Sequence, residues 1–329
     1  MTTRDRIKRT LNFEPVDRLP VIEWAHWWGE TIDRWRGEGL PDGLDREALF
    51  AYLGLDLHHQ YWITPIAPDY PPSKGHGIGN VESREDYLEL KRFLYPDPAF
   101  DAEAVRGWAR KQAAGETAVW ISLEGPFWFP RTLFGIEPHL YAFYDQPELM
   151  REINEDLLAY NLRVFEQFCD ICVPDFMTFA EDMSYNHGPM LSAGQFEEFI
   201  SPFYHRICPV IRERGTVIFV DTDGDVTVPV QWYEGVGVEG FLPLERMAGV
   251  DINAIRESHP RLRMVGAFDK TIMHLGEERM RQEFERILPV MRQGGYIPSC
   301  DHQTPPGVSL EDYRLYVRLL AEYAQAAVI

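Results

Sequence analysis

Short apolar runs alternate with amphipathic stretches along most of the chain. In the clearest run, residues 216–221 (TVIFVD), nearly every position is apolar; the turn Arg214-Gly215 precedes the run and Gly224 follows it. A run of this kind predicts a strand that is buried on both faces, as in a parallel sheet. Strands are predicted in the same way at residues 19–24, 55–63, 117–125, 175–183, 216–221, 240–245, 263–269 and 295–302.

Stretches with a helical spacing of apolar residues lie between the predicted strands and at both ends of the chain. Strand and helix alternate about eight times in one chain of 329 residues, and no linker divides it. The pattern therefore predicts a single (β/α)8 TIM barrel over residues 1–329, with an N-terminal helical extension and inserted loops at residues 64–80 and 125–136. Helices are predicted at residues 1–13, 45–54, 136–145, 147–170, 194–213, 251–258, 276–293 and 309–326.

Nearly every predicted strand ends on an ionisable residue. In a parallel barrel the carboxyl ends of the strands meet at one face, where the following loops place the chemistry. Carboxylates gathered there raise one another's pKa values unless a cation or a proton offsets them. A bound metal ion is the simplest way to neutralise these carboxylates, and an ion-pair network or shared protons are the alternatives. The residues are Glu23, Glu124, Glu181 with Asp182, Asp221 with Asp223, Glu245, Asp269, and Cys300 with Asp301 and His302.

Composition and charge narrow the class of protein. The hydrophobic share of 45% excludes general disorder, and the formal net charge of −20 argues against nucleic acid or an anionic membrane as a partner. No segment has the apolar length of a signal peptide or a membrane span. The four cysteines indicate free thiols in a reducing compartment, with Cys169 and Cys172 as buried apolar residues rather than a redox pair. We therefore expect a soluble cytoplasmic enzyme that acts on a small-molecule substrate.

Aromatic and polar residues near the predicted strand ends are candidates for substrate contact. Trp24, His26 and Trp27 follow the first predicted strand, where bulky side chains either line a pocket or pack under a loop. Glu124 ends the third predicted strand. His187 lies in the polar loop after the fourth, which either contacts substrate or forms a tight turn. These five residues are the candidate substrate-binding set.

Five longer stretches carry a family resemblance: RDRIKRTLNFEPVDRLPV, EDMSYNHGPMLSAGQFEEFISPFYHRI, VDTDGD, GAFDK and GYIPSCDHQTPPGVSLEDYRLYVRLL. They resemble the uroporphyrinogen decarboxylase superfamily, which includes the decarboxylase itself and the zinc-dependent, corrinoid-linked methyltransferases. The resemblance extends over nearly the whole chain and implies the same (β/α)8 barrel. Membership does not by itself decide the activity.

The methyltransferase branch carries a His-x-Cys pair after one strand and a Cys after the last, with 76 residues between them. In this chain Asp221-x-Asp223 stands at the place of the pair, and 76 residues separate Asp223 from Cys300. The resemblance therefore implies Asp221, Asp223 and Cys300 as ligands of a divalent metal, zinc in the family, with Glu245 completing the set. Two aspartates in place of His and Cys make the site richer in oxygen than the family's.

The same branch implies methyl transfer. The metal would polarise the heteroatom of a methyl donor or acceptor, and the methyl group would pass to or from a corrinoid. The chain has no Asp-x-His-x-x-Gly signature, so the corrinoid is expected on a separate protein. An oxygen-rich site suits an oxygen-bearing substrate, which makes O-demethylation of a methyl ether the leading hypothesis. His302, Asp182 and Glu181 are the catalytic candidates, and His302 or Glu181 is an alternative metal ligand.

Two other functions stay open. The decarboxylase branch implies an arginine-rich motif where this chain has IEWAHWWGE. In addition, the carboxyl end of the predicted barrel is rich in Asp and Glu, which would repel a tetrapyrrole with many carboxylates. His302 nevertheless matches the C-terminal histidine of that branch, and Asp56 falls near its catalytic aspartate. A barrel that has lost catalysis and serves for binding is the second alternative, because Asp replaces His and Cys at positions 221 and 223. A homodimer is an open option for the assembly.

Overall fold

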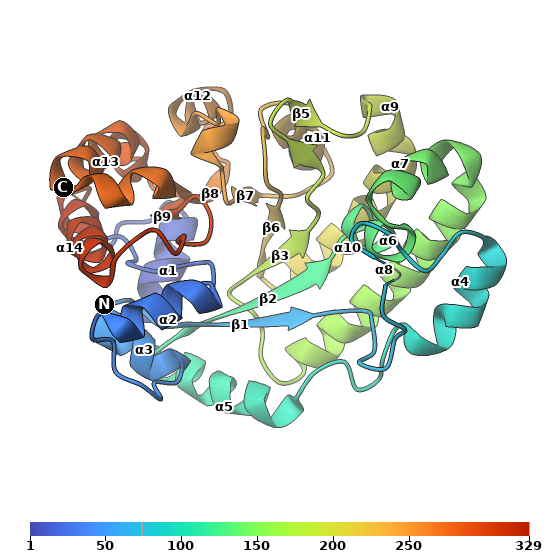
Figure 1. Cartoon of the computed structure of the whole chain (residues 1–329), viewed down its shortest axis with the longest axis horizontal. Helices are drawn as coiled ribbons and strands as arrows, with labels where there is room; N and C mark the ends of the chain where they lie inside the picture. The colour runs from blue at the N-terminus through green and yellow to red at the C-terminus, as the bar shows by residue number, and fades with distance from the viewer. Residues whose placement is uncertain (74, 329) are drawn as a thin grey trace.

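A curled parallel sheet of seven strands forms the centre of the protein (Figure 1). The computed structural model describes residues 1–73 and 75–328. The strand order is β1-β2-β3-β6-β7-β8-β9, and every pairing is parallel. The strands are β1 (His58–Ile63), β2 (Ala118–Glu124), β3 (Phe176–Ala180), β6 (Val217–Asp221), β7 (Gly240–Leu242), β8 (Arg263–Phe268) and β9 (Tyr296–Cys300), and a small antiparallel hairpin pairs β4 (Ser184–Tyr185) with β5 (Gly188–Pro189).

Helices connect the strands and surround the sheet (Figure 1). The predicted alternation of strand and helix is confirmed. The predicted loop at 125–136 is largely helix α6, and the predicted helix at 194–213 is divided by a π-helical turn. The α-helices are α1 (Thr3–Leu11), α2 (Gly29–Gly37), α3 (Arg46–Leu53), α4 (Arg84–Leu90), α5 (Ala102–Ala113), α6 (Trp128–Phe134), α7 (Ile136–Asp145), α8 (Pro147–Cys169), α9 (Ala193–Gln195), α10 (Ser201–Glu213), α11 (Pro229–Gly235), α12 (Ile252–Ser258), α13 (Glu277–Met291) and α14 (Leu310–Ala326); the π-helical turn is Phe196–Ile200, and 3-10 turns cover Lys91–Phe93, Arg246–Ala248 and Lys270–Leu275.

The prediction of a strand at residues 19–24 is wrong. The segment is extended and contacts β9 and the residues just before β1, but it joins neither ladder. Its backbone donors are used otherwise: Pro20 has none, the Val21 N–H donates to the Asp56 carboxylate (2.9 Å), and the Trp24 N–H donates to a serine hydroxyl of β9 (3.3 Å). Among the described residues the sheet therefore has seven strands instead of the eight of the predicted barrel. Side-chain hydrogen bonds hold this segment in place, together with two backbone bonds outside the ladders, from the Leu19 N–H to the Ala324 carbonyl (3.1 Å) and from the Asp56 N–H to the Val21 carbonyl (2.7 Å).

Glu23 ties the extended segment to β9 and α14. Its side chain is 1% exposed and accepts hydrogen bonds from Ser299 Oγ (2.9 Å) and from the Tyr313 hydroxyl (3.0 Å). Burial raises the pKa of the carboxyl group to about 7. A buried carboxyl group that keeps its proton to near-neutral pH thus takes the place of backbone pairing here.

Aromatic and aliphatic side chains fill the inside of the curled sheet. Trp120, Phe176 and Phe219 come from neighbouring strands and pack with ring centroids 5.1 and 5.9 Å apart. Helix α1 adds Ile7 and Leu11 to the same cluster, so it covers the amino end of the interior. A larger apolar layer lies between the sheet and the surrounding helices. The carboxyl end of the interior is left for polar side chains, as is usual for this class of fold.

The cysteines and the helices bear on two expectations from the sequence. All four cysteines are buried and free, as expected. Among the residues that the structure describes, no helix combines the length and the apolar character that crossing a membrane requires.

Gly240 begins β7 at a place with no room for a side chain. A Cβ there would lie 2.4 Å from the Phe219 ring and 2.8 Å from the Arg263 carbonyl oxygen. We expect Gly240→Ala to lower the free energy of unfolding by about 1–3 kcal/mol, the usual cost of overpacking, as measured by urea denaturation. Gly235→Ala is the matched control, because nothing lies within 4 Å of its Cβ position. Equal stability of the two variants would contradict the packing described.

The buried Glu23 carboxyl group makes stability depend on pH. Its pKa is about 7 in the folded protein, against 4.5 for an ordinary glutamate. Its contribution to stability is therefore complete below pH 4.5 and is lost as the pH rises through 7. Between these values we expect the free energy of unfolding to fall by about 3 kcal/mol more in the wild type than in Glu23→Gln, as measured by urea titrations. The exposed Glu89→Gln serves as control, and parallel curves for wild type and Glu23→Gln would refute the prediction.

Candidate active site

A cavity of about 340 Å³ lies at the carboxyl end of the sheet. Its volume suits a small molecule. Tryptophan rings supply apolar walls, and aspartate, histidine and glutamine side chains supply polar groups. The lining residues are Trp24, Ala25, His26, Gln60, Trp62, Trp128, Ala180, Asp182, Asp221, Asp223, His302 and Gln303.

Three of these lining residues are aspartates that follow or end two paired strands. Asp182 comes just after β3 with a left-handed backbone (φ 43°), which costs a residue other than glycine about 1 kcal/mol or more. Its side chain accepts the Asp223 N–H (3.4 Å), and burial together with the Asp223 charge raises the pKa of Asp182 to about 6. Burial and the charges of Asp182, Asp223 and Glu245 raise the pKa of Asp221, the last residue of β6, well above its usual value. This acidic wall therefore favours a bound proton or cation.

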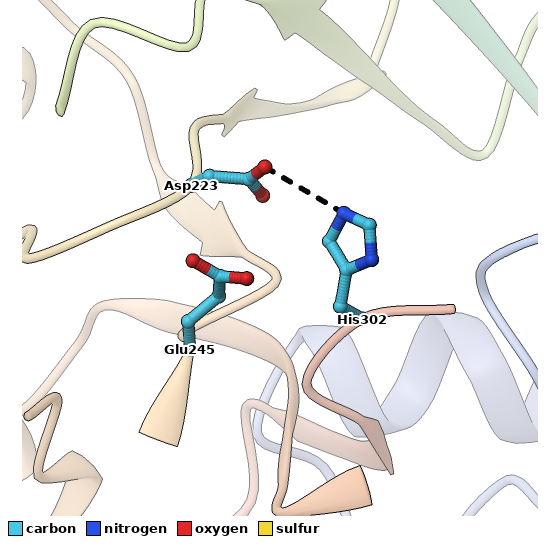
Figure 2. A group of neighbouring side chains, drawn as sticks. All are labelled: Asp223, Glu245 and His302. Carbon is cyan, nitrogen blue, oxygen red and sulfur yellow. Dashed lines mark ion pairs between the residues drawn. The ribbon is translucent and has the colours of Figure 1, made fainter. Parts of the chain in front are cut away.

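Asp223, Glu245 and His302 converge beside the acidic wall (Figure 2). They follow three different strands, β6, β7 and β9, and each is partly buried. One donor atom of each residue lies within 4.8 Å of those of the other two. His302 Nε2 is 3.6 Å from Asp223 Oδ2, and this interaction raises the pKa of His302. Figure 2 shows the Glu245 carboxylate directed toward this pair.

Hydrogen bonds between loops position the three side chains. The Gly224 N–H donates to Glu245 Oε2 (2.9 Å), which joins the loop after β6 to the loop after β7. Asp301, next in sequence to the histidine, accepts the N–H groups of Arg246 (3.0 Å) and Lys270 (3.1 Å). These bonds connect the loop after β9 to those after β7 and β8. These contacts hold the Glu245 side chain directly and the loop that carries His302 through Asp301, as second-layer contacts do in preformed metal sites.

The donor set fits a divalent metal ion. Two carboxylates and an imidazole are ligands that zinc, iron and manganese sites use. Asp223 and His302 also line the cavity, so an ion held by the three residues would face a ligand bound there. Lys270 Nζ lies 3.9 Å from Glu245 Oε1. Without a metal the same residues make an ion-pair network, Asp223 with His302 and Glu245 with Lys270.

The structure does not bring Cys300 to this group. Ile297 of β9 belongs to the interior cluster, and three residues later the alternation of the strand turns Cys300 outward, towards α14. The side chain is fully buried, and burial beside Glu23 raises the pKa of the thiol well above its usual value. A thiol that keeps its proton is a poor metal ligand. Of the four predicted ligands, Asp223 and Glu245 lie together, and His302 is the third residue of the group. Asp221 lines the cavity beside them, whereas Cys300 lies on the other face of the sheet.

Glu181 and Glu124 are buried and do not line the cavity. Glu181 accepts hydrogen bonds from the N–H groups of Phe127 (2.8 Å) and Trp128 (3.2 Å) and from the Tyr204 hydroxyl. Burial raises the pKa of both glutamates to about 7. Glu181 therefore anchors the start of α6, and through it one wall of the cavity, instead of facing a ligand.

The candidate substrate-binding residues divide between the cavity and other places. Trp24 and His26 line the cavity. Trp27 packs against rings of α2, α3 and α14, with centroids 5.7 to 6.0 Å apart. His187 is exposed in the turn between β4 and β5, against the ring of Tyr185. Trp27 and His187 therefore have the packing and turn roles that stood as alternatives for them.

Six of the twelve lining residues were not candidates from the sequence: Ala25, Gln60, Trp62, Trp128, Ala180 and Gln303. Gln60 and Trp62 lie two residues apart in β1, so a period of two in HHQYWI places both on one face of the strand. That signal was present in the sequence. Trp128 gives no such signal, because it reaches the cavity only through the helix that forms at 128–134 and through its anchor, Glu181.

The chain is similar to known proteins in fold and in sequence. The fold resembles that of a methyltransferase from Methanosarcina mazei, with a TM-score of 0.65 and 16% identity over 98% of this chain and 99% of that one. Fungal β-1,4-galactanases match with a TM-score of 0.47 and 10% identity over 91% of this chain and 99% of theirs. A comparison with curated proteins finds no match. The likeness to the methyltransferase shows the fold alone. The family model for uroporphyrinogen decarboxylase (URO-D) matches residues 77–323, most of the chain, which therefore belongs to the uroporphyrinogen decarboxylase family.

Proposed function

We propose that the protein is a metal-dependent methyltransferase, which moves a methyl group between a small methyl ether in the cavity and a corrinoid carried by a separate protein. The observation that carries the proposal is the convergence of Asp223, Glu245 and His302 at a cavity of small-molecule size. Family membership supports an enzyme, and the likeness in fold to a methyltransferase is consistent with this choice.

Asp223, Glu245 and His302 would hold the divalent ion, zinc by analogy with the family. Bound there, the ion would supply Lewis-acid polarisation of the substrate oxygen. The set contains no thiolate, and an oxygen-rich site suits an oxygen-bearing substrate better than a thiol. This preference is the basis for proposing a methyl ether.

Other side chains would position the substrate. Trp24, Trp62 and Trp128 supply apolar surface that excludes water from the ligand. Asp182 lines the same cavity and hydrogen-bonds to the Asp223 backbone, so it is placed to exchange a proton with the oxygen that loses or gains the methyl group. We assign Asp182 this role on its position.

The decarboxylase alternative has less support. The lining residues of the cavity include three aspartates and neither arginine nor lysine, which suits a polycarboxylate poorly. Asp56, the residue near the decarboxylase's catalytic aspartate, is paired with Arg18 (2.6 Å) and bonded to the Val21 N–H, and it does not line the cavity. A non-catalytic binding barrel would have no need for the three converging donors.

Metal content tests the ligand assignment. We expect about one divalent ion per chain in purified wild-type protein, and a large loss in Glu245→Gln and His302→Ala, because each removes one donor of the set. Elemental analysis together with the protein concentration gives the number of metal ions per chain. Cys300→Ser is the matched control and should keep its metal, since the thiol faces α14. Loss of metal from Cys300→Ser with retention in Glu245→Gln would reverse the assignment.

Methyl transfer tests the reaction. With methyl ethers as donors and reduced free cobalamin as acceptor, we expect formation of methylcobalamin, followed by its absorbance. Removal of a ligand in His302→Ala should lower the rate by about 100-fold or more, whereas Cys300→Ser should stay close to wild type. Release of carbon dioxide from uroporphyrinogen would instead establish the decarboxylase. Stoichiometric metal without either reaction would favour the binding barrel.

A further inference from the structure

Arg46 is a partly buried cation that forms no ion pair with a carboxylate among the described residues. It opens α3, and its two terminal nitrogens donate to His26 Nδ1 (2.8 Å) and to His58 Nε2 (3.0 Å). Its Nε is cut off from solvent and has no partner, and its guanidinium carbon lies 4.6 Å from the centre of the Phe50 ring. Burial lowers the pKa of Arg46 to about 10, so the side chain is still charged at neutral pH.

The contact with Arg46 decides which nitrogen of His26 carries the proton. A guanidinium group only donates hydrogen bonds, so His26 Nδ1 is the acceptor. Burial and the Arg46 charge lower the pKa of His26, and the neutral ring then bears its proton on Nε2. His26 lines the cavity, and no described residue accepts a hydrogen bond from its Nε2. A donor backed by a full positive charge is therefore available to a ligand.

His58 does not neutralise Arg46 from the inner side. It is fully buried among aromatic rings, burial and the Arg46 charge keep its pKa well below the usual value, and its Nδ1 has no partner. The acidic wall does not pair with Arg46 either, since none of its aspartates forms an ion pair or a hydrogen bond with the guanidinium, whose contacts are His26, His58 and the Phe50 ring. A partly buried cation without a counter-ion is unfavourable. What this side of the cavity lacks is an anion.

We propose that Arg46 and His26 form an anion subsite, in which His26 Nε2–H, polarised by Arg46, binds a carboxylate group of the small molecule in the cavity. One carboxylate balances the charge of the one guanidinium group, and a charge-assisted hydrogen bond is stronger than a neutral one. The cavity volume of about 340 Å³ suits a small carboxylic acid.

The subsite gives the cavity two unlike sides. The carboxylate of the ligand would lie against His26, and the group that reacts would lie against Asp223 and His302. The identification of this ligand as the methyl donor rests on the proposed function, which would make the substrate a methoxy-substituted carboxylic acid. The subsite itself does not depend on the reaction, so it can be tested by binding alone.

Calorimetric titration with benzoate and benzamide tests the subsite, because the two probes share size and shape and differ in charge. We expect wild-type protein to bind benzoate at least about tenfold more tightly than benzamide. The titrations are run with a chelator present and again with added zinc. A preference for benzoate that vanishes with the chelator would place the anion on the metal and overturn the proposal, as would tighter binding of inorganic phosphate.

Variants separate Arg46 from general electrostatics. Arg46→Gln should weaken benzoate binding about tenfold or more and change benzamide binding by less than about twofold. Arg110→Gln removes the same charge from an exposed position and should bind both probes like wild type. His26→Phe, which leaves Arg46 in place, should also lose the preference and serves if Arg46→Gln does not fold. Retention of the preference in His26→Phe would refute the subsite. Absence of methyl transfer would leave these results unaffected, so the two proposals can fail separately.

Discussion

The carboxyl groups of Asp182, Asp221 and Asp223 share one end of the curled sheet, where burial strengthens their mutual repulsion. Burial first, and this repulsion second, raise the pKa values of Asp182 and Asp221. The parallel arrangement of the strands creates this repulsion, because it places every strand end at the same edge. The loop after β9 places His302 next to Asp223, and the turn after β8 places Lys270 next to Glu245 of the neighbouring loop. The geometry of the candidate metal site is a result of that compensation.

Carboxyl groups in this protein have a second use, as internal anchors. Glu23 holds the extended segment to β9 and α14, Glu181 holds the start of α6, and Asp56 takes a backbone donor of the extended segment. Each of them accepts hydrogen bonds from neighbouring parts of the chain, and none lines the cavity. An acidic residue at a strand end is therefore not by itself evidence of a site. The surroundings of the carboxylate decide whether it supports the wall or faces a ligand.

The two sides of the cavity come from different parts of the chain. The acidic side is built from β3, β6 and the loops after β7 and β9, whereas the basic side comes from His26 and from Arg46 of α3. The extended segment connects them, since it carries both Trp24 and His26 into the lining. Because side-chain hydrogen bonds hold this segment in place of a ladder, the position of His26 depends on anchors such as Glu23.

The sequence by itself determined the α/β class, the seven strands of the sheet and the edge at which the chemistry lies, because buried parallel strands need uninterrupted apolar runs and their polar ends converge. It also indicated Asp223, Glu245 and His302 among a larger set. Only the tertiary structure decided that Cys300 faces α14, that residues 19–24 form no strand and that Arg46 meets His26. These outcomes depend on side-chain direction and on partners distant in sequence. Shifting β9 by one residue would turn the Cys300 side chain to the opposite face. Long-range hydrogen bonds decide the conformation of residues 19–24 and the contact between Arg46 and His26.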